Sequence, residues 1–300
     1  MSTIHSAEIA PVYIITKDDA PAPQPTLTKD LHPTTWRTGI WLDTKKRAAY
    51  YPCKPSTKYV YDRAYISCAI FSSTYVEVTD EDTLYAGKRL QEKGLNPLLL
   101  NFSDDMYAGG CVDAGSSAQE ESLWRRTNLC ETQVDDFYPL NKDPAEGIYS
   151  PEVSVFKASE RDECVDLEKS YTTSFVAVPA LQRPITLHKR FRPDDEIILR
   201  NKIRLIFQIA HKNGHDSLVL GAWGCGAWMC PPLPVAQLFK EVLREFEGVF
   251  KHITFAVLKS PAMFAVHIRQ EYATNYEVFS SIFSPAVNSI KVDNSVLHIF

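Results

Sequence analysis

Apolar and polar positions from Tyr75 onward predict strands that alternate with helices. Tyr75–Val78 alternates in the manner of a strand, and Leu98–Phe102 is apolar enough for a buried strand. Between them, Thr79 and Asp82 have the spacing of a helix start, and Gly94 is a helix stop. Four further strands are predicted at Val153–Phe156, Ser174–Val178, Ser217–Leu220 and Ile253–Leu258.

Helices are predicted between these strands from apolar stripes of helical period. One helix starts at Asp194 or Asp195 and ends near Lys212, with its apolar residues on one face. The other predicted helices span Ser117–Cys130, Pro234–Phe250 and Ala262–Tyr272, and Leu181–Pro193 is predicted as a loop. Strands and helices that alternate in this way predict a three-layer α/β domain with a mainly parallel or mixed central sheet.

The first seventy residues lack this alternation. Met1–Lys29 contains four prolines and is either a mobile arm or an arm packed on the surface. The stretch from Trp36 to Tyr65 is rich in Trp and Tyr, and Pro52 and Pro55 interrupt any long helix there. We therefore divide the chain into an N-terminal extension, residues 1–70, which packs on the core, and a folded domain, residues 71–300.

Composition narrows the class of protein. The 300 residues are 45% hydrophobic and 23% charged, which is ordinary for a soluble globular protein, and no run is long enough to span a membrane. Seven scattered cysteines and no recognisable secretory signal favour reduced thiols in an intracellular compartment, cytoplasmic or nuclear. A net charge of −5 argues against non-specific binding of nucleic acid.

Two glycine-rich loops follow predicted strands and precede predicted helices. The first contains Gly109 and Gly110, and the second is the stretch 221–232. Such loops lie at the carboxyl ends of strands in open α/β sheets, where backbone N–H groups favour phosphate. Packing alone also accounts for such loops, so a phosphate ligand and a structural role both stay open.

Two adjacent carboxylates open the helix after the first loop. Ser116 and Gln119, or Ser117 and Glu120, have the spacing of a capping box, which places Glu120 and Glu121 in the first helical turn. Acidic residues are common there because they complement the helix dipole. Neighbouring helical side chains point about 100° apart, so one carboxyl group of this pair can bind while the other transfers a proton.

Several separated motifs resemble the microbial-type poly(ADP-ribose) glycohydrolases, a branch of the macrodomain superfamily. That family has an apolar strand ending in Asn-Phe, three glycines, and Gln-Glu-Glu at a helix start. The corresponding residues are Asn101-Phe102, Gly109-Gly110-Cys111 and Gln119-Glu120-Glu121. Residues 148–156, 218–226 and 255–258 resemble later motifs of the family, so the likeness covers Tyr75 to Leu258.

This resemblance implies a three-layer α/β/α macrodomain-like fold with a mixed sheet, and hydrolysis of the ribose–ribose bond of poly(ADP-ribose). Glu121 would be the general acid and base, Glu120 would hold ribose hydroxyls, and Gln119 would orient the loop or the second glutamate. Asn101 would contact the terminal ribose. The remaining ligand-binding residues would be Gly109, Gly110, Cys111, Gly224, Cys225, Gly226 and Ala227 around the diphosphate, and Trp228 over the terminal ribose.

The resemblance implies no metal or organic cofactor. ADP-ribose would be the product, and poly(ADP-ribose) or ADP-ribosylated macromolecules the partners of a monomeric enzyme. A zinc site at His211, His215, Cys225 and Cys230 is disfavoured because the spacings fit no common zinc pattern. Two other functions remain open: removal of single ADP-ribose units from protein or nucleic acid, and ADP-ribose binding without catalysis.

Three positions depart from the family pattern. Cys111 replaces the third glycine, which narrows the approach of the diphosphate or forbids a positive φ angle. We interpret Cys111 as a buried small residue without chemistry of its own. Trp228 stands where the family usually has Phe, and Cys230 precedes two prolines where the family tends to have a polar residue.

Overall fold

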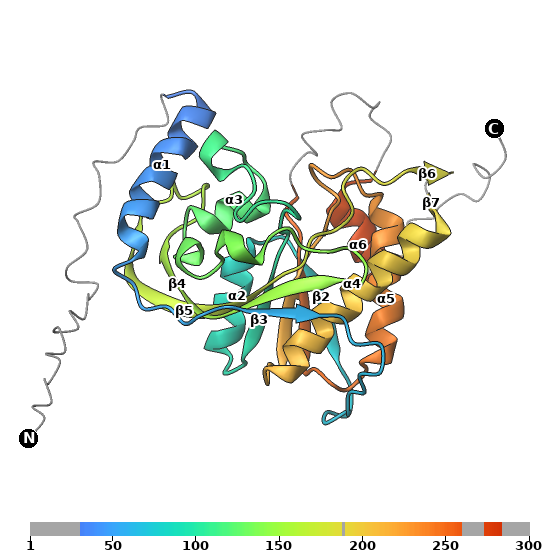
Figure 1. The fold of residues 1–300 in the computed structure, drawn as a ribbon. Helices are drawn as coiled ribbons and strands as arrows, with labels where there is room; N and C mark the ends of the chain where they lie inside the picture. The colour runs from blue at the N-terminus through green and yellow to red at the C-terminus, as the bar shows by residue number, and fades with distance from the viewer. Residues whose placement is uncertain (1–30, 188–189, 260–272, 284–300) are drawn as a thin grey trace, which may run out of the picture.

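A seven-stranded mixed sheet forms the centre of the computed structural model, which describes residues 31–187, 190–259 and 273–283 (Figure 1). The strand order is β1-β4-β5-β3-β8-β9-β2, antiparallel at the β1–β4 and β4–β5 pairs and parallel at the other four. The strands are β1 (Thr57–Val60), β2 (Tyr75–Thr79), β3 (Pro97–Asn101), β4 (Glu146–Lys157), β5 (Asp166–Ala177), β8 (Ser217–Leu220) and β9 (His252–Ala256). The predicted mixed sheet is confirmed.

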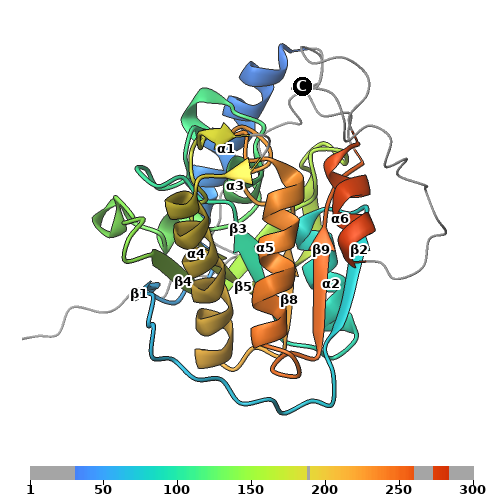
Figure 2. The same cartoon turned by 90° about the vertical axis from the view of Figure 1, so that its right-hand side faces the viewer.

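Helices cover both faces of this sheet. They are α1 (Pro33–Ala48), α2 (Thr83–Glu92), α3 (Gln119–Trp124), α4 (Pro193–Lys212), α5 (Pro232–Glu245) and α6 (Asn275–Phe283). Figure 2 shows α4, α5 and α6 in front of the sheet, with α2 behind it. A short hairpin, β6 (Thr186–Leu187) and β7 (Arg190–Phe191), occupies part of the segment that we predicted as a loop.

The three leucines of β3 explain why both faces must be covered. Successive side chains of a strand point to opposite faces. Leu98 and Leu100 pack in the core beneath α4 and α5, whereas Leu99 packs in the core beneath α1 and α2. All three are fully buried, which is the pattern of a central strand between two helical layers. The three-layer architecture is therefore confirmed.

The N-terminal region contributes regular structure that the sequence did not predict. Helix α1 ends at Ala48, so Pro52 and Pro55 follow it instead of interrupting it. Strand β1 pairs with β4 at the edge of the central sheet. The region therefore extends the sheet as well as packing on it, while the boundary at residue 70 stays a prediction. The predicted arm Met1–Lys29 and the predicted helix Ala262–Tyr272 lie outside the described residues.

The start of α2 differs from the predicted one. Thr79 is the last residue of β2, and Asp82 caps the helix by accepting a hydrogen bond from the Leu84 N–H at 2.9 Å. The Thr79–Asp82 pair is thus not a capping box. Asp82 gains a second role, because its carboxylate forms two hydrogen bonds with the Arg126 guanidinium, at 2.7 and 2.9 Å.

Candidate active site

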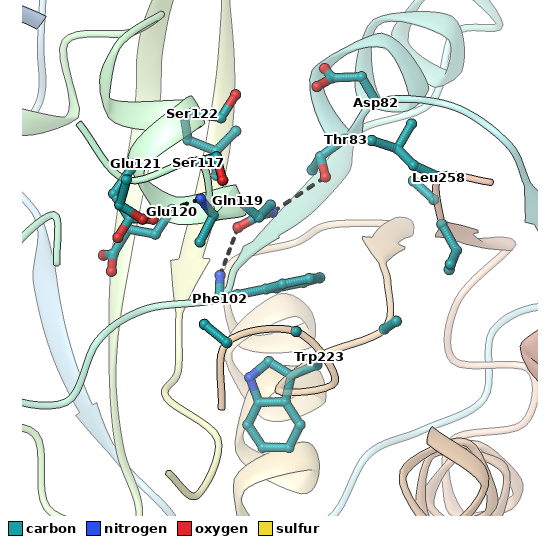
Figure 3. A pocket seen from close by; sticks show the side chains of 18 of the residues that line it. Asp82, Thr83, Phe102, Ser117, Gln119, Glu120, Glu121, Ser122, Trp223 and Leu258 are labelled. Atoms are coloured by element: carbon teal, nitrogen blue, oxygen red, sulfur yellow. Dashed lines mark hydrogen bonds between the residues drawn. The ribbon is translucent and has the colours of Figure 1, made fainter. Parts of the chain in front are cut away.

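A cavity of about 820 Å³ lies where β3, β8, β9 and β2 end. These four parallel strands bring their carboxyl ends to one edge of the sheet, the usual place for a ligand in an open α/β fold. Figure 3 shows α3 on one side of the cavity and the loop after β8 on the other. Eight of the twelve predicted site residues line the cavity, namely Cys111, Gln119, Glu120, Glu121, Gly224, Gly226, Ala227 and Trp228.

Gln119 fixes the start of α3 to the end of β3. Its side-chain oxygen accepts a hydrogen bond from the Phe102 N–H at 2.9 Å, and its amide nitrogen donates to the Leu100 carbonyl at 2.8 Å. The same nitrogen donates to Thr83 Oγ1 at 3.3 Å, as Figure 3 shows. Ala118 occupies the N-cap position without a side-chain cap, so the predicted capping box is wrong. The predicted orienting role of Gln119 agrees with these contacts.

Glu120 is a buried carboxyl group with two donors. Its Oε2 accepts a hydrogen bond from the Asp104 N–H at 2.7 Å, and its Oε1 accepts one from Asn101 Nδ2 at 3.2 Å. Burial raises the pKa of Glu120 well above its usual value, and the neighbouring Glu121 acts in the same direction, although both hydrogen bonds oppose them. Asn101 does not line the cavity. It is fully buried and supports Glu120, which differs from the ligand contact that we predicted.

Glu121 keeps one oxygen free. Its Oε1 accepts a hydrogen bond from the Cys111 N–H at 3.1 Å. Its Oε2 is buried and has no partner among the residues that the structure describes. Glu121 lines the cavity, and Oε2 is the oxygen of its carboxyl group that no protein donor occupies. A positioned carboxyl group with one uncommitted oxygen is suited to proton transfer.

The first glycine loop lies tightly against α3. Gly109 and Gly110 have φ angles of +77° and +55°, which glycine adopts readily. A Cβ atom on Gly109 would lie 2.6 Å from the Trp124 ring, and one on Gly110 would lie 3.0 Å from Oε1 of Glu121. The N–H groups of Gly110 and Cys111 donate to the Tyr107 carbonyl and to Glu121, so both are already used within the protein.

Cys111 does not have the environment that we predicted. Its φ angle is −99°, so a side chain causes no backbone strain, and the residue is exposed at the cavity wall. The interpretation as a buried residue is therefore wrong. Partial desolvation raises the pKa of the thiol, and the carboxylates of Glu121, Asp104 and Glu120 raise it further. The group stays a protonated thiol at neutral pH.

The second glycine loop has the free N–H groups that the first lacks. Within the described ranges, no acceptor is found for the N–H groups of Gly226, Ala227 and Trp228. Successive unpaired N–H groups in a turn form an anion-binding site. Gly221 allows the loop to approach β3 and β9, because a Cβ atom there would lie 2.8 Å from the Phe102 ring and 2.9 Å from the Ala256 carbonyl. Cys225 does not line the cavity, and its thiol donates to the Trp223 carbonyl.

Several lining residues were not predicted from the sequence. Phe102 extends its ring between Gln119 and the second loop, and Trp223 lies beneath that loop, where its indole N–H donates to the Val178 carbonyl at 2.8 Å (Figure 3). The cavity rim carries carboxylates that form ion pairs with side chains that do not line the cavity, such as Asp82 with the buried Arg126. Phe102 was within reach of sequence reasoning because it follows Asn101 in the recognised pair. The acidic residues of the rim come from segments that are distant in the sequence, and no local pattern marks them as residues of the site.

The four residues considered for zinc have other partners. His211 bonds to the Tyr65 hydroxyl, and His215 lies 3.0 Å from the Tyr149 hydroxyl. The Cys230 thiol donates to the Leu181 carbonyl. Across the described part of the chain, no group of three or more His, Cys, Asp or Glu residues could hold a metal ion. In the same residues, no helix is long and apolar enough to cross a membrane.

Comparison of the sequence and the fold with known proteins identifies a family. The family described as "Microbial-type PARG, catalytic domain" matches residues 43–158. The poly(ADP-ribose) glycohydrolase from Deinococcus radiodurans, solved in complex with ADP-ribose, is 30% identical with a TM-score of 0.58, over 71% of this chain and 85% of that chain. The enzyme from Thermomonospora curvata, solved with the inhibitor ADP-HPD, is 26% identical with a TM-score of 0.67, over 82% and 98% of the two chains.

No curated protein sequence gives a significant match. The fold, the glutamate pair and the two glycine loops define a macrodomain-like hydrolase site. The chain belongs to the microbial-type poly(ADP-ribose) glycohydrolases. The family predicted from the sequence motifs is thus confirmed.

Proposed function

We propose that this chain hydrolyses the O-glycosidic ribose–ribose bond of poly(ADP-ribose) and releases ADP-ribose. The observation that carries the proposal is the free Oε2 of Glu121, which is buried at the cavity wall while Oε1 is held by the Cys111 N–H. The opposite wall offers the free N–H groups of residues 226–228 to a diphosphate. The two solved relatives, described as glycohydrolases with ADP-ribose or an inhibitor bound, support the assignment.

The proposed reaction uses one principal carboxyl group. Glu121 gives its proton to the oxygen of the leaving ribose as the glycosidic C–O bond breaks, which leaves an oxocarbenium-like sugar. Water then attacks the anomeric carbon and returns a proton to Glu121, which restores the starting state. Most glycosidases divide these steps between two carboxyl groups on either side of the bond. Here the two glutamates are adjacent in one helix, so they cannot flank it in that way.

Glu120 has a binding role in this scheme. Burial raises the pKa of Glu120, and a neutral Glu120 lets Glu121 become the single negative charge of the pair once its proton has passed to the leaving ribose. The hydrogen bonds from Asp104 and Asn101 fix its orientation. A fixed carboxyl group can hold ribose hydroxyls while its neighbour transfers the proton.

We infer the direction of the ligand from the order of the strands. β8 lies between β3 and β9 in the sheet, so the loop that follows β8 lies between the glutamates and the ends of β9 and β2. With the reacting ribose at Glu121 and the diphosphate at residues 226–228, the adenosine extends toward Val257 and Leu258. Both residues line the cavity and offer apolar surface for a base.

The cellular setting is part of the same proposal. Cys53, Cys68 and Cys111 are free and exposed, which suits a reducing intracellular compartment, cytoplasmic or nuclear. We propose that the chain acts there as a monomer on poly(ADP-ribose) or ADP-ribosylated macromolecules.

Incubation of the purified chain with poly(ADP-ribose) of defined length tests the proposal. We expect free ADP-ribose to accumulate with time, and its appearance without longer oligomers would indicate cleavage from the chain end. A mono-ADP-ribosylated peptide in parallel separates polymer cleavage from removal of single units. Calorimetric binding of ADP-ribose without release from either substrate would instead identify a non-catalytic binding protein.

A further inference from the structure

Helix α1 contacts the loop that carries the Cys111 N–H, although it belongs to the N-terminal region. Trp41 donates its indole N–H to Oδ1 of Asp113 at 2.6 Å, and Asp113 lies two residues after Cys111. Asp113 belongs to a short 3-10 helix, Val112–Ala114, at the centre of the loop. This single hydrogen bond therefore joins α1 to the turn that presents the Cys111 N–H to Glu121.

A second contact joins the start of α1 to the same loop. Gly115, with a φ angle of +71°, passes so close to α1 that a Cβ atom on it would lie 2.5 Å from the Thr34 carbonyl. The loop thus meets α1 at both Asp113 and Gly115. Between Gly109 and Ala118 the backbone pairs with no strand and its backbone–backbone hydrogen bonds are local turns, so contacts with α1 help to set its position relative to α3.

Helix α1 also contacts the helix that carries the glutamates. The Trp41 ring lies 5.9 Å from the Trp124 ring, and Trp124 is the last residue of α3. The hydroxyl of Thr44 donates to the Arg125 carbonyl, one residue farther on. Figure 1 shows α1 alongside α3 on the same side of the sheet. Trp41 is therefore placed between the loop and the catalytic helix.

Buried ion pairs fix α1 to the core. Asp43 accepts hydrogen bonds from Lys157 Nζ at 2.6 Å and from the Arg47 guanidinium at 3.2 Å. Asp166, at the start of β5, accepts from Arg47 at 2.8 and 2.9 Å and from Lys157 at 3.0 Å. Asp43, Arg47 and Lys157 are at most 6% exposed, so α1 has one defined position relative to β4 and β5.

We propose that Trp41 is a positioning residue for the hydrolytic reaction, acting through Asp113 to hold the Cys111 N–H against Glu121. This inference rests on the proposed function. A donor that is held in place costs no reorganisation when charge develops on the glutamate, whereas a mobile donor does. The N-terminal region thus supplies part of the active-site geometry in addition to its packing.

Three substitutions test this role. Trp41→Phe keeps an aromatic ring in place but removes the N–H donor, and Asp113→Ala removes the acceptor. Each should lower kcat for ADP-ribose release about tenfold, the change expected for one well-formed hydrogen bond, with KM within about threefold of wild type. Asp113→Asn keeps Oδ1 as an acceptor and should retain most of the rate. The double variant Trp41→Phe/Asp113→Ala should be no slower than the slower single variant, because both remove the same bond.

Tyr51→Leu is the control for a general loss of stability in the N-terminal region. Tyr51 stacks on Phe156 at 4.2 Å just after α1 and has no role in the loop. This variant should lose thermal stability but keep the wild-type kcat at a temperature where it is folded. Calorimetry should give unchanged ADP-ribose affinity for Trp41→Phe, which separates positioning from binding.

The outcomes distinguish the inference from the proposed function. A wild-type chain that releases no ADP-ribose would remove the proposed function, and this inference with it. An active wild type with a Trp41→Phe variant of equal kcat would overturn the inference alone. So would equal losses in Asp113→Asn and Asp113→Ala, since the hydrogen bond would then not be the cause.

Discussion

The backbone N–H of Cys111 donates a hydrogen bond to Oε1 of Glu121 over 3.1 Å, from a loop ten residues earlier in the chain. This contact depends on two features. The glycines before Cys111 let the loop approach α3, and Trp41 holds the loop from the other side through Asp113. Oε2 of Glu121 has no partner among the described residues, so it is the oxygen left for the proposed proton transfer.

Gly110→Ala should abolish most turnover because of where its side chain would lie. A Cβ atom would come within 3.0 Å of Oε1 of Glu121 and 3.1 Å of Oε2 of Glu120, and it would also strain a residue whose φ angle is +55°. We expect at least about a hundredfold loss of kcat, as for misplaced catalytic groups, with about 1–2 kcal/mol of stability lost to the backbone strain.

Gly94→Ala provides the control for that strain. Gly94 has a φ angle of +77°, but a Cβ atom added to it would meet nothing within 4 Å. It should lose about the same 1–2 kcal/mol in urea unfolding and keep the wild-type kcat. Equal turnover in Gly110→Ala and Gly94→Ala would contradict the prediction, because it would show that the two glutamates tolerate a methyl group beside them.

Cys111→Gly should make the chain more like its family without making it a better enzyme. The φ angle of −99° suits any residue, so glycine there gains only freedom in the unfolded state, which lowers stability by about 0.4–1 kcal/mol. The N–H donor remains, so kcat should stay within about threefold of wild type. A tenfold gain in kcat/KM would show instead that the thiol obstructs the substrate.

Glu120→Gln should change how stability depends on pH. Burial raises the pKa of Glu120 in the folded state, so the folded protein is favoured at low pH, where the group is protonated in both states. As the pH rises from the pKa of Glu120 in the unfolded chain to its pKa in the folded protein, the free energy of unfolding falls. The loss is about 1.4 kcal/mol for each pH unit between the two pKa values.

Glutamine cannot ionise, so the variant should gain stability relative to wild type between pH 4 and pH 8. Urea unfolding at both values measures the difference. Glutamine has only one acceptor oxygen for the hydrogen bonds from the Asp104 N–H and Asn101 Nδ2. The loss of one bond lowers the stability of the variant equally at both pH values. A wild-type-minus-variant difference that is the same at pH 4 and pH 8 would contradict a raised pKa.

The central sheet was predictable from sequence because its strands are buried on both faces. Ser217–Leu220 was predicted to the residue, since all four of its residues are buried and Asp216 and Gly221 flank them. Only the C-terminal parts of β4 and β5 were found. The N-terminal part of β4 mixes buried and half-buried positions without a clear period, and that of β5 is half-buried or exposed throughout. Helix α1 was missed because polar residues, Asp43, Thr44 and Arg47, occupy its buried face.

The site was predictable where a local motif marks it and unpredictable where distant segments meet. Gln119, Glu120 and Glu121 follow from their position at a helix start. The end of α3 at Trp124 could not be predicted in this way. Arg125 turns inward and donates hydrogen bonds to the Ser116 carbonyl and to Glu160, and neither contact is visible in the sequence. The same limit hid Trp41, which lies 72 residues from the partner of its indole N–H.

Turnover and binding by Glu121→Gln, measured on one preparation, test the central claim most directly. Glutamine keeps the size of the side chain and an oxygen for the Cys111 N–H, but it cannot donate and recover a proton as a carboxyl group does. We predict that release of ADP-ribose from poly(ADP-ribose) falls at least about a thousandfold, while calorimetric affinity for ADP-ribose stays within about threefold of wild type. Release at close to the wild-type rate would contradict the assignment of Glu121 as the acid and base.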